Sequence, residues 1–212
     1  VLPFEIQNNR SQSSRILASV QVLETQEKEL WEAYWRLGTS LLLCYDLSLE
    51  KLAQPRRDYI LTAFGDRRAT IAQHLQQTWS HVGPKRASLI PLLAGPVLDL
   101  TQSTCVPSKE LGHNIYWDLL LTGLGNSEAL RALQSCTIDA VGNVVHSFGL
   151  GVLRKLDLDQ YVEFFSQNLS KRIAECPAQV FTGSSRDSAV HFIRDVTEVL
   201  LPTENQSWSH GV

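Results

Sequence analysis

Apolar side chains recur at helical spacing along most of this chain. The clearest case lies within residues 26–44, where Leu30, Tyr34, Leu37 and Leu41 follow one another every three or four positions. This spacing places the four side chains on one face of a 3.6-residue helix. We therefore expect that face to pack against neighbouring elements.

Glycine and proline residues mark where the next helices begin and end. Pro55 suits the first turn of a helix that Gly65 ends, and Asp66 is placed to cap a following helix that stops at Gly83-Pro84. The apolar positions of the two helices are Tyr59, Ile60 and Phe64 in the first, and Ile71, Leu75, Trp79 and Val82 in the second.

The short apolar segment 88–93 contains Pro91 and is followed by Gly95-Pro96. Proline removes a backbone donor and clashes with the preceding turn of a helix. We therefore expect a kinked or broken helix here, not a strand.

The second half of the chain repeats the helical design. Pro107-Ser108 starts one helix, Ser127 is expected to cap the next, and two more helices follow before Pro202. Their apolar stripes are Leu111, Ile115 and Leu119; Leu130, Leu133, Val141 and Val145; Leu158, Tyr161, Phe165, Leu169 and Ile173; and Val190, Ile193, Val196 and Leu200.

These patterns predict an all-α fold, an irregular helical array of about eight or nine helices similar to an armadillo or HEAT solenoid segment. Residues 1–212 are expected to form a single array segment, with 1–14 as a loop before a helix that begins near Arg15. The sequence has no strict period, which also leaves an irregular helical bundle open. No hairpin turn with alternating flanks predicts a sheet.

Composition narrows the functional classes. The formal net charge of -3 and the pI near 6.1 provide no basic field for nucleic acid, so we expect no nucleic-acid partner. No apolar run approaches the roughly 20 residues that span a bilayer. The absence of Met, including a first one, suggests a piece of a larger polypeptide.

The cysteines and histidines form no recognisable metal or catalytic pattern. Cys44, Cys105, Cys136 and Cys176 are widely spaced, which predicts free, mostly buried thiols in a cytosolic protein. The sequons at Asn168-Leu169-Ser170 and Asn205-Gln206-Ser207 would matter only in a secreted protein. Neither His74 and His81 on one helix nor the separate His113, His146 and His191 complete a ligand set.

Other candidate features favour structural roles. The basic pairs Arg56-Arg57, Arg67-Arg68 and Lys85-Arg86 are either a local patch for phospholipid head groups or an acidic partner, or a solvated face, which is the commoner case. Core anchors are expected at Trp31, Trp35 and Trp79, turns at Gly123-Leu124-Gly125 and Gly149-Leu150-Gly151, and solvated acids at Asp157, Asp159 and Glu163.

An ordered set of motifs between residues 29 and 118 resembles the helical region that precedes the exchange domain in the DOCK (dedicator of cytokinesis) family. The motifs are Leu30-Trp31-Glu32-Ala33-Tyr34-Trp35, Leu47-Ser48-Leu49-Glu50, Phe64-Gly65-Asp66-Arg67-Arg68, Trp79-x-x-Val82-Gly83, Ile90-Pro91 and Gly95-Pro96. Further along, the likeness is limited to Gln160-Tyr161 and the last apolar helix. Phe148-Gly149-Leu150-Gly151 and Leu200-Leu201-Pro202 depart from the family pattern, which indicates a divergent member.

The resemblance implies a parent protein that promotes nucleotide exchange on a Rho-family GTPase, typically Rac, and so regulates the cytoskeleton. It implies a cytoplasmic scaffold segment whose protein partners are adaptors and other domains of the parent, with recruitment of the parent to the plasma membrane left open. The GTPase would bind the parent's exchange domain. No catalytic, cofactor-binding or metal-binding residue is expected in residues 1–212, and no cofactor. The alternatives are an unrelated helical-repeat adaptor that binds a peptide and, third, an enzyme with a site formed only by tertiary proximity.

Overall fold

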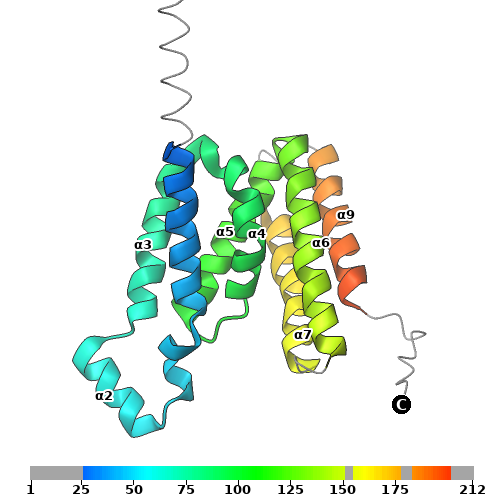
Figure 1. Ribbon diagram of the computed structural model, residues 1–212. Coiled ribbons are helices and arrows are strands. Elements are labelled where there is room, and N and C mark those ends of the chain that lie inside the picture. Colours follow the sequence, from blue (N-terminus) through cyan, green and yellow to red (C-terminus); the bar gives the residue numbers. More distant parts are fainter. Residues whose placement is uncertain (1–25, 151–154, 178–182, 202–212) are drawn as a thin grey trace, which may run out of the picture. The chain divides into compact units, whose positions relative to one another are not determined.

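The computed structural model describes residues 26–150, 155–177 and 183–201. Every regular element in these ranges is helical, and none of them is a β-strand (Figure 1). The chain divides into two compact units, Val1–Leu37 and Gly38–Val212. The expected all-α class is confirmed, whereas the expected loop at 1–14 and the helix start near Arg15 lie outside the described residues.

The described elements follow one another with short connections. A helix covers residues 26–43. Since α7, η4 and α8 continue one another without a break, α2 to α9 make up seven separate helices in the described ranges, in addition to the helix over 26–43. The bounds are η1 (Tyr45–Leu47), η2 (Leu49–Lys51), α2 (Gln54–Phe64), α3 (Arg67–Val82), η3 (Gly83–Lys85), α4 (Arg86–Leu100), α5 (Val106–Leu124), α6 (Ser127–Gly149), α7 (Lys155–Glu163), the π-helical η4 (Phe164–Leu169), α8 (Ser170–Glu175) and α9 (Gly183–Leu200).

The described part of the first unit is the start of the helix over 26–43. The Tyr34 ring packs edge-on against Trp31 and Trp35, with ring centroids 6.2 and 5.7 Å away. Lys28 and Glu32 form an ion pair one turn apart, with Nζ 3.7 Å from Oε1. These local pairs support a helix whose aromatic side chains cluster on its surface.

The expected packing face of this helix is wrong. Leu30 and Leu37 are 71% and 62% exposed, whereas Trp35 and Leu42 are buried. The reason is visible in the second unit at Gly38, where an added Cβ would lie 2.7 Å from Leu75 Cδ2. Within the second unit, the side of the helix that carries Gly38 therefore lies close against Leu75 of α3.

The ends of α2 and α3 follow the sequence prediction. The Asp66 Oδ1 atom accepts a hydrogen bond of 2.9 Å from the Arg68 backbone N–H, as an N-cap does. Gly65 and Gly83 adopt φ values of 69° and 58°, which only glycine adopts without strain. In α3 the side chains of Leu75, Trp79 and Val82 are buried as expected.

Helix α4 confirms that a helix and not a strand contains Pro91, and of the two expected forms, kinked or broken, it excludes the broken one. It runs without interruption from Arg86 to Leu100, with both Pro91 and Pro96 inside it. Tertiary burial explains why the helix persists, because its apolar side chains are packed on nearly all sides and outweigh two lost backbone hydrogen bonds. The buried residues are Leu89, Ile90, Leu93, Ala94, Val97, Leu98 and Leu100.

Two further expectations on α5 and α6 need correction. The N-cap of α6 is Asn126, not Ser127, because the Asn126 Oδ1 atom accepts from the backbone N–H groups of Glu128 and Ala129. Gly123 is not a turn residue but a buried position inside α5, where an added Cβ would lie 3.0 Å from Leu130 Cα. Its missing side chain lets α5 and α6 approach closely.

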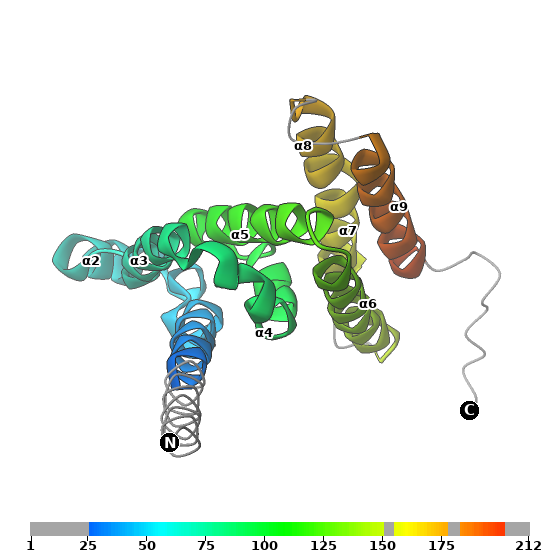
Figure 2. The same ribbon diagram turned by 90° about the horizontal axis from the view of Figure 1, so that it is seen from above.

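Alternate helices of the second unit pack side by side. Helix α3 packs on α5, α4 packs on α6, and α5 lies against both α4 and α6. Helix α9 packs on α6 and on the run formed by α7, η4 and α8, as Figure 2 shows. This pattern is typical of α-solenoid arrays, whose core is renewed at every added helix.

The four cysteines differ in burial. All four cysteines are free, but only Cys105 is buried, so the expectation of mostly buried thiols is wrong for Cys44, Cys136 and Cys176, which are half-buried.

Among the described residues, no helix has both the length and the apolar character needed to cross a bilayer.

Candidate functional site

The five histidines in the described residues do not converge on a common site. His74 and His81 lie exposed on α3, His146 on α6 and His191 on α9. Within the described residues no three His, Cys, Asp or Glu side chains are grouped as metal ligands would be. The candidate functional features are therefore surfaces and not a chemical centre.

His113 lies in a partly buried, aromatic environment at the contact of α5 and η4. Its ring stacks on Phe164 at a centroid distance of 5.0 Å. Burial of the ring, helped by the nearby positive charges of Lys109 and Arg172, lowers the pKa of His113 to about 4. The neutral ring therefore serves as an aromatic packing group between α5 and η4 at neutral pH.

The predicted basic pairs do not form one patch. Arg68 is buried, and its Nη2 atom lies 2.6 Å from Glu50 Oε1 and 3.4 Å from Asp66 Oδ2. Arg86 covers the Trp79 ring, with its Cζ atom 5.1 Å from the ring centroid, and its Nη1 atom lies 3.6 Å from Asp118 Oδ2. One arginine of each of these two pairs is thus used inside the structure, while the Arg56-Arg57 pair, Arg67 and Lys85 remain at the surface.

A groove lies between α9 and the run of η4 and α8. It has a volume of about 810 Å³. Its apolar lining comes from Ile173, Ala174, Val190, Ile193 and Leu201. Val190 and Leu201 are 54% and 53% exposed, so the groove presents apolar surface to solvent.

The groove exists because α9 is apolar on two sides. One side buries Phe192, Val196 and Leu200, while Val190 and Leu201 extend into the groove. The expectation that Val190 belongs to the buried stripe is wrong for this reason. Exposed apolar side chains that lie together in a groove are typical of a surface that another element covers.

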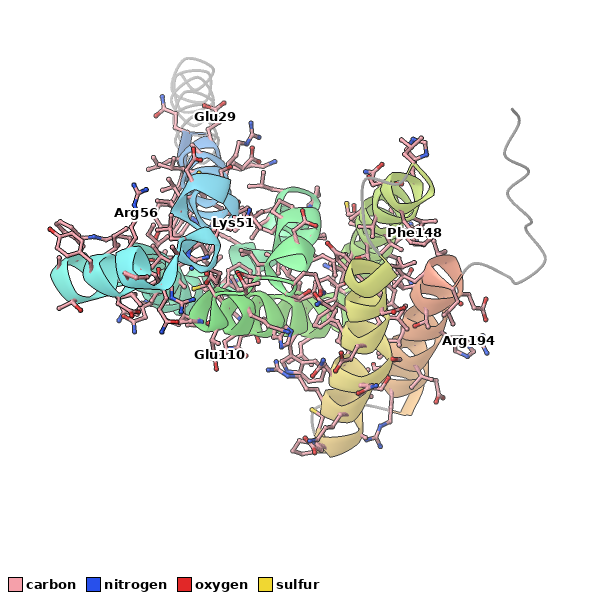
Figure 3. All side chains as sticks on the ribbon, turned by 90° about the horizontal axis from the view of Figure 1, so that it is seen from below. Glu29, Lys51, Arg56, Glu110, Phe148 and Arg194 are labelled. Carbon is pink, nitrogen blue, oxygen red and sulfur yellow. The ribbon has the colours of Figure 1, made fainter. Side chains whose placement is uncertain are left out.

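Charged side chains border the groove. Arg186 Nη2 donates to the backbone carbonyls of Ile173 at 2.9 Å and Ala174 at 3.2 Å, which satisfies acceptors near the end of α8. Arg194 lies on the outer side of α9 (Figure 3), donates to His191 Nδ1 at 2.8 Å and pairs with Glu198 at 3.8 Å. These partners hold the arginines at the border of the groove and leave its floor apolar.

The opposite wall contains the π-helical segment η4. The Ser170 hydroxyl donates to the Phe165 carbonyl five residues earlier, at 3.2 Å, and Ser166 donates to Val162 at 2.7 Å. The wider turn allows Phe164 and Phe165, which are adjacent in sequence, to be buried together. The hydrophobic pattern predicts neither the π-helical segment nor the groove, and the pair of adjacent aromatic residues is the one local feature of the sequence that accompanies the segment.

Comparison with known proteins agrees with this architecture. Residues 11–152 match the family described as the dedicator of cytokinesis (DOCK) TPR region. The chain is 24% identical over 180 residues to dedicator of cytokinesis protein 4 of Homo sapiens. The matched stretch makes up 84% of this chain and 8% of that protein. It is 25% identical over 178 residues to dedicator of cytokinesis protein 3 of Homo sapiens, which covers 81% of this chain and 8% of that protein.

A third relative, dedicator of cytokinesis protein 4 of Mus musculus, is 27% identical over 125 residues, 58% of this chain and 6% of that protein. No solved structure matches the chain significantly. The chain thus spans about 8% of the length of the curated relatives in the longer matches. Because the family match extends over most of the sequence, including α2 to α6, this chain belongs to the DOCK family and represents its TPR region.

Proposed function

We propose that this chain is a non-catalytic helical scaffold of a DOCK-type guanine nucleotide exchange factor for Rho-family, Rac-like GTPases. The observation that carries this proposal is the match of residues 11–152 to the DOCK TPR region. Exchange itself would belong to another domain of the parent protein. The scaffold would hold that domain in position relative to adaptor proteins in the cytoplasm, and at the plasma membrane when the parent is recruited there.

The interior of the second unit supports a positioning role. Polar side chains tie helices together across the core: Trp79 Nε1 donates to Asp118 Oδ2 at 2.8 Å, and the Tyr116 and Thr137 hydroxyls are 2.8 Å apart. Tyr161 also donates to Asp99 Oδ1 at 3.0 Å. The Tyr116–Thr137 bond is buried and the other two are partly buried, and hydrogen bonds of this kind favour one arrangement of the helices over others, which a positioning element requires.

Release of a fluorescent guanine nucleotide from purified Rho-family GTPases tests the proposal. We expect the 212-residue chain not to accelerate release, because exchange requires groups that act on the nucleotide's phosphates and magnesium or that remodel the switch loops. A GTPase sample with EDTA serves as the positive control. A saturable acceleration by this chain alone would contradict the non-catalytic assignment.

The groove favours a second candidate function within the same family. The alternative of an unrelated repeat adaptor is wrong, because the chain belongs to the DOCK family. Binding of a helical segment remains attractive, since an apolar groove of about 810 Å³ between two helices suits side chains at positions i, i+4 and i+7 of an amphipathic helix. We propose that a helix from elsewhere in the parent occupies it.

Two matched variants test the groove. Val190→Asp places a charge in the groove, whereas Val199→Asp places it on an exposed part of α9 outside the groove lining. We expect only Val190→Asp to weaken binding of this chain to the separately purified remainder of the parent, by about tenfold. Equal binding by the two variants would remove the groove from the interface.

A further inference from the structure

Helix α2 is presented to solvent with nothing in the described residues that covers it. None of its residues is buried, and Tyr59, Leu61 and Phe64 are 67%, 40% and 57% exposed. In Figures 1 and 2, α2 projects beyond α3 on the side away from α4 to α6. An isolated helix of this length is marginal in water, so its retention with three exposed apolar side chains calls for a reason.

The base of this projection is fixed. Glu50 precedes α2 and Asp66 follows it, and the buried Arg68 guanidinium binds both carboxylates, at 2.6 and 3.4 Å. Arg68 itself lies in the first turn of α3. The two ends of the excursion are therefore held together at the start of α3, and α2 is displayed from a defined base.

One stripe of α2 combines positive charge with apolar anchors. Arg57, Leu61 and Phe64 occupy positions i, i+4 and i+7 and so share one helix face, with Arg56 beside them. Neither Arg56, Arg57 nor the nearby Arg67 has an ion pair within the described ranges, and Figure 3 shows the Arg56 side chain directed away from the ribbon. Arg68 already occupies Glu50 and Asp66, and α2 itself carries a single carboxylate, Asp58, so this surface has an excess of positive charge.

We propose that α2 is a docking helix that inserts Leu61 and Phe64 into an apolar groove of a partner protein, while Arg56 and Arg57 pair with carboxylates at the rim of that groove. Anchors at i+4 and i+7 are the recognition pattern of helix-in-groove complexes, and the uncompensated arginines fix the sign of the partner's rim as acidic. This function is independent of the positioning role proposed above.

Two other occupants fit the same surface less well. A second copy of the chain, packed α2 against α2, would offer Arg56 and Arg57 the same excess of positive charge and so would not supply the carboxylates that they need. A bilayer requires one broad apolar face, whereas Tyr59 lies on the side of α2 opposite Leu61. An acidic, grooved protein avoids both problems.

The first test replaces Phe64 in the full 212-residue chain with the photo-crosslinking residue p-benzoylphenylalanine. The control chain carries the same crosslinking residue in place of Thr62. Thr62 is also exposed but lies outside the stripe. We expect protein adducts at Phe64 that are absent at Thr62, and mass spectrometry identifies the protein. A missing protein adduct, an adduct with a second copy of the chain, or an adduct with lipid alone overturns the proposal.

Capture of a protein is not sufficient, so the second test measures binding of the purified adduct protein by calorimetry. We expect Phe64→Ala and Arg57→Glu each to raise Kd by about tenfold or more, and Kd to rise with salt. Leu150→Ala and Arg131→Glu are matched controls at exposed sites away from α2 and should leave Kd unchanged. Circular dichroism checks that helicity is retained. Unchanged affinity in the α2 variants, or Phe64-dependent sedimentation with phosphatidylserine vesicles, contradicts docking to a protein.

Discussion

At the scale of single residues, the second unit depends on polar side chains that each join several helices. Trp79 of α3 donates its indole N–H to Asp118 of α5, and Arg86 of α4 both covers the indole ring and donates to the Trp79 backbone carbonyl at 3.2 Å. One buried aromatic side chain thus joins α3, α4 and α5. The apolar burial supplies most of its stabilisation, and the indole hydrogen bond fixes the orientation of the ring.

Replacement of Trp79 tests this role. We expect Trp79→Ala to lower the free energy of unfolding by about 3–5 kcal/mol, the usual result of emptying a packed aromatic site. Gln77→Ala, an exposed change on the same helix, should alter it by less than about 0.5 kcal/mol. Urea unfolding followed by circular dichroism measures both. A midpoint for Trp79→Ala equal to that of Gln77→Ala would show that the ring is not packed as described.

His113 makes stability depend on pH. Its pKa is about 4 in the folded chain against an ordinary value of 6.5, because burial and the charges of Lys109 and Arg172 disfavour the imidazolium. Between these two values the unfolded chain binds the proton and the folded chain does not, so stability falls as the pH is lowered from about 6.5 towards 4. Because the ring is only half-buried, we expect a loss of about 1–2 kcal/mol and not the full value of the shift.

His113→Gln provides the comparison for this pH effect. The amide does not titrate, so the part of the pH dependence that belongs to His113 should disappear, although the loss of stacking on Phe164 lowers stability at every pH. Urea midpoints at pH 7 and pH 5 measure the difference in slope. The same slope in both proteins would mean that His113 is accessible to protons in the folded state.

At the scale of elements, close helix packing is set by glycine. In α5 an added Cβ at Gly112 would lie 2.8 Å from the Thr101 backbone nitrogen and 2.9 Å from the Leu100 carbonyl carbon, both on backbone that cannot rotate away. Gly142 in α6 has nothing within 4 Å of the same position. The two glycines have the same helical context but opposite steric surroundings.

This contrast predicts opposite signs for one substitution. We expect Gly112→Ala to destabilise the chain by about 1–3 kcal/mol through overpacking. Gly142→Ala should stabilise it by about 0.5–1 kcal/mol through the helix propensity of alanine. Thermal or urea unfolding of the two variants beside the parent chain measures the signs. Stabilisation by Gly112→Ala would show that α5 has room to shift away from the end of α4.

Sequence patterns predicted the elements better than their packing. The caps at Asp66, Gly65 and Gly83 and the buried stripe from Leu158 to Ile173 were predictable because they depend on local backbone geometry and on helical periodicity. The continuous helix through Pro91 was not predictable, because burial on nearly all sides outweighed a local helix-breaking signal.

The candidate surfaces could not be predicted from local sequence patterns, because they depend on residues that are distant in the sequence. Val190 belongs by spacing to the same apolar set as Ile193 and Val196, and only the position of α8 decides that it lines a groove. Arg67 and Arg68 are equivalent in the sequence, yet Arg68 is buried between two carboxylates and Arg67 is exposed. Such distinctions arise from tertiary neighbours, which a single sequence does not reveal.

At the scale of the whole molecule, the second unit contains the two separate surfaces that we propose as binding sites for partners. The groove beside α9 is apolar and lies at the C-terminal end of the described helices, whereas α2 is basic and apolar and comes near the start of the unit. A scaffold that joins several components needs more than one such surface, and their different chemistry allows different occupants. The tightly packed helices α3 to α6 separate them along the sequence.

Placement by this scaffold can be tested in the parent protein. Trp79→Ala loosens the core without changing a residue of either surface. We therefore expect the parent protein with this substitution to raise the amount of GTP-bound Rho-family GTPase in cells several-fold less than the unaltered parent does. Capture of the GTPase on an effector domain measures this amount, which is divided by the abundance of the parent. The separately expressed exchange domain should retain full activity, because it does not contain the array. The parent with Gln77→Ala should signal normally, because this exposed change leaves the array intact. Division by abundance separates loss of placement from loss of protein. Equal GTPase loading by the Trp79→Ala parent at equal abundance would contradict a scaffold role, since a weakened array would then position the exchange domain as well as an intact one.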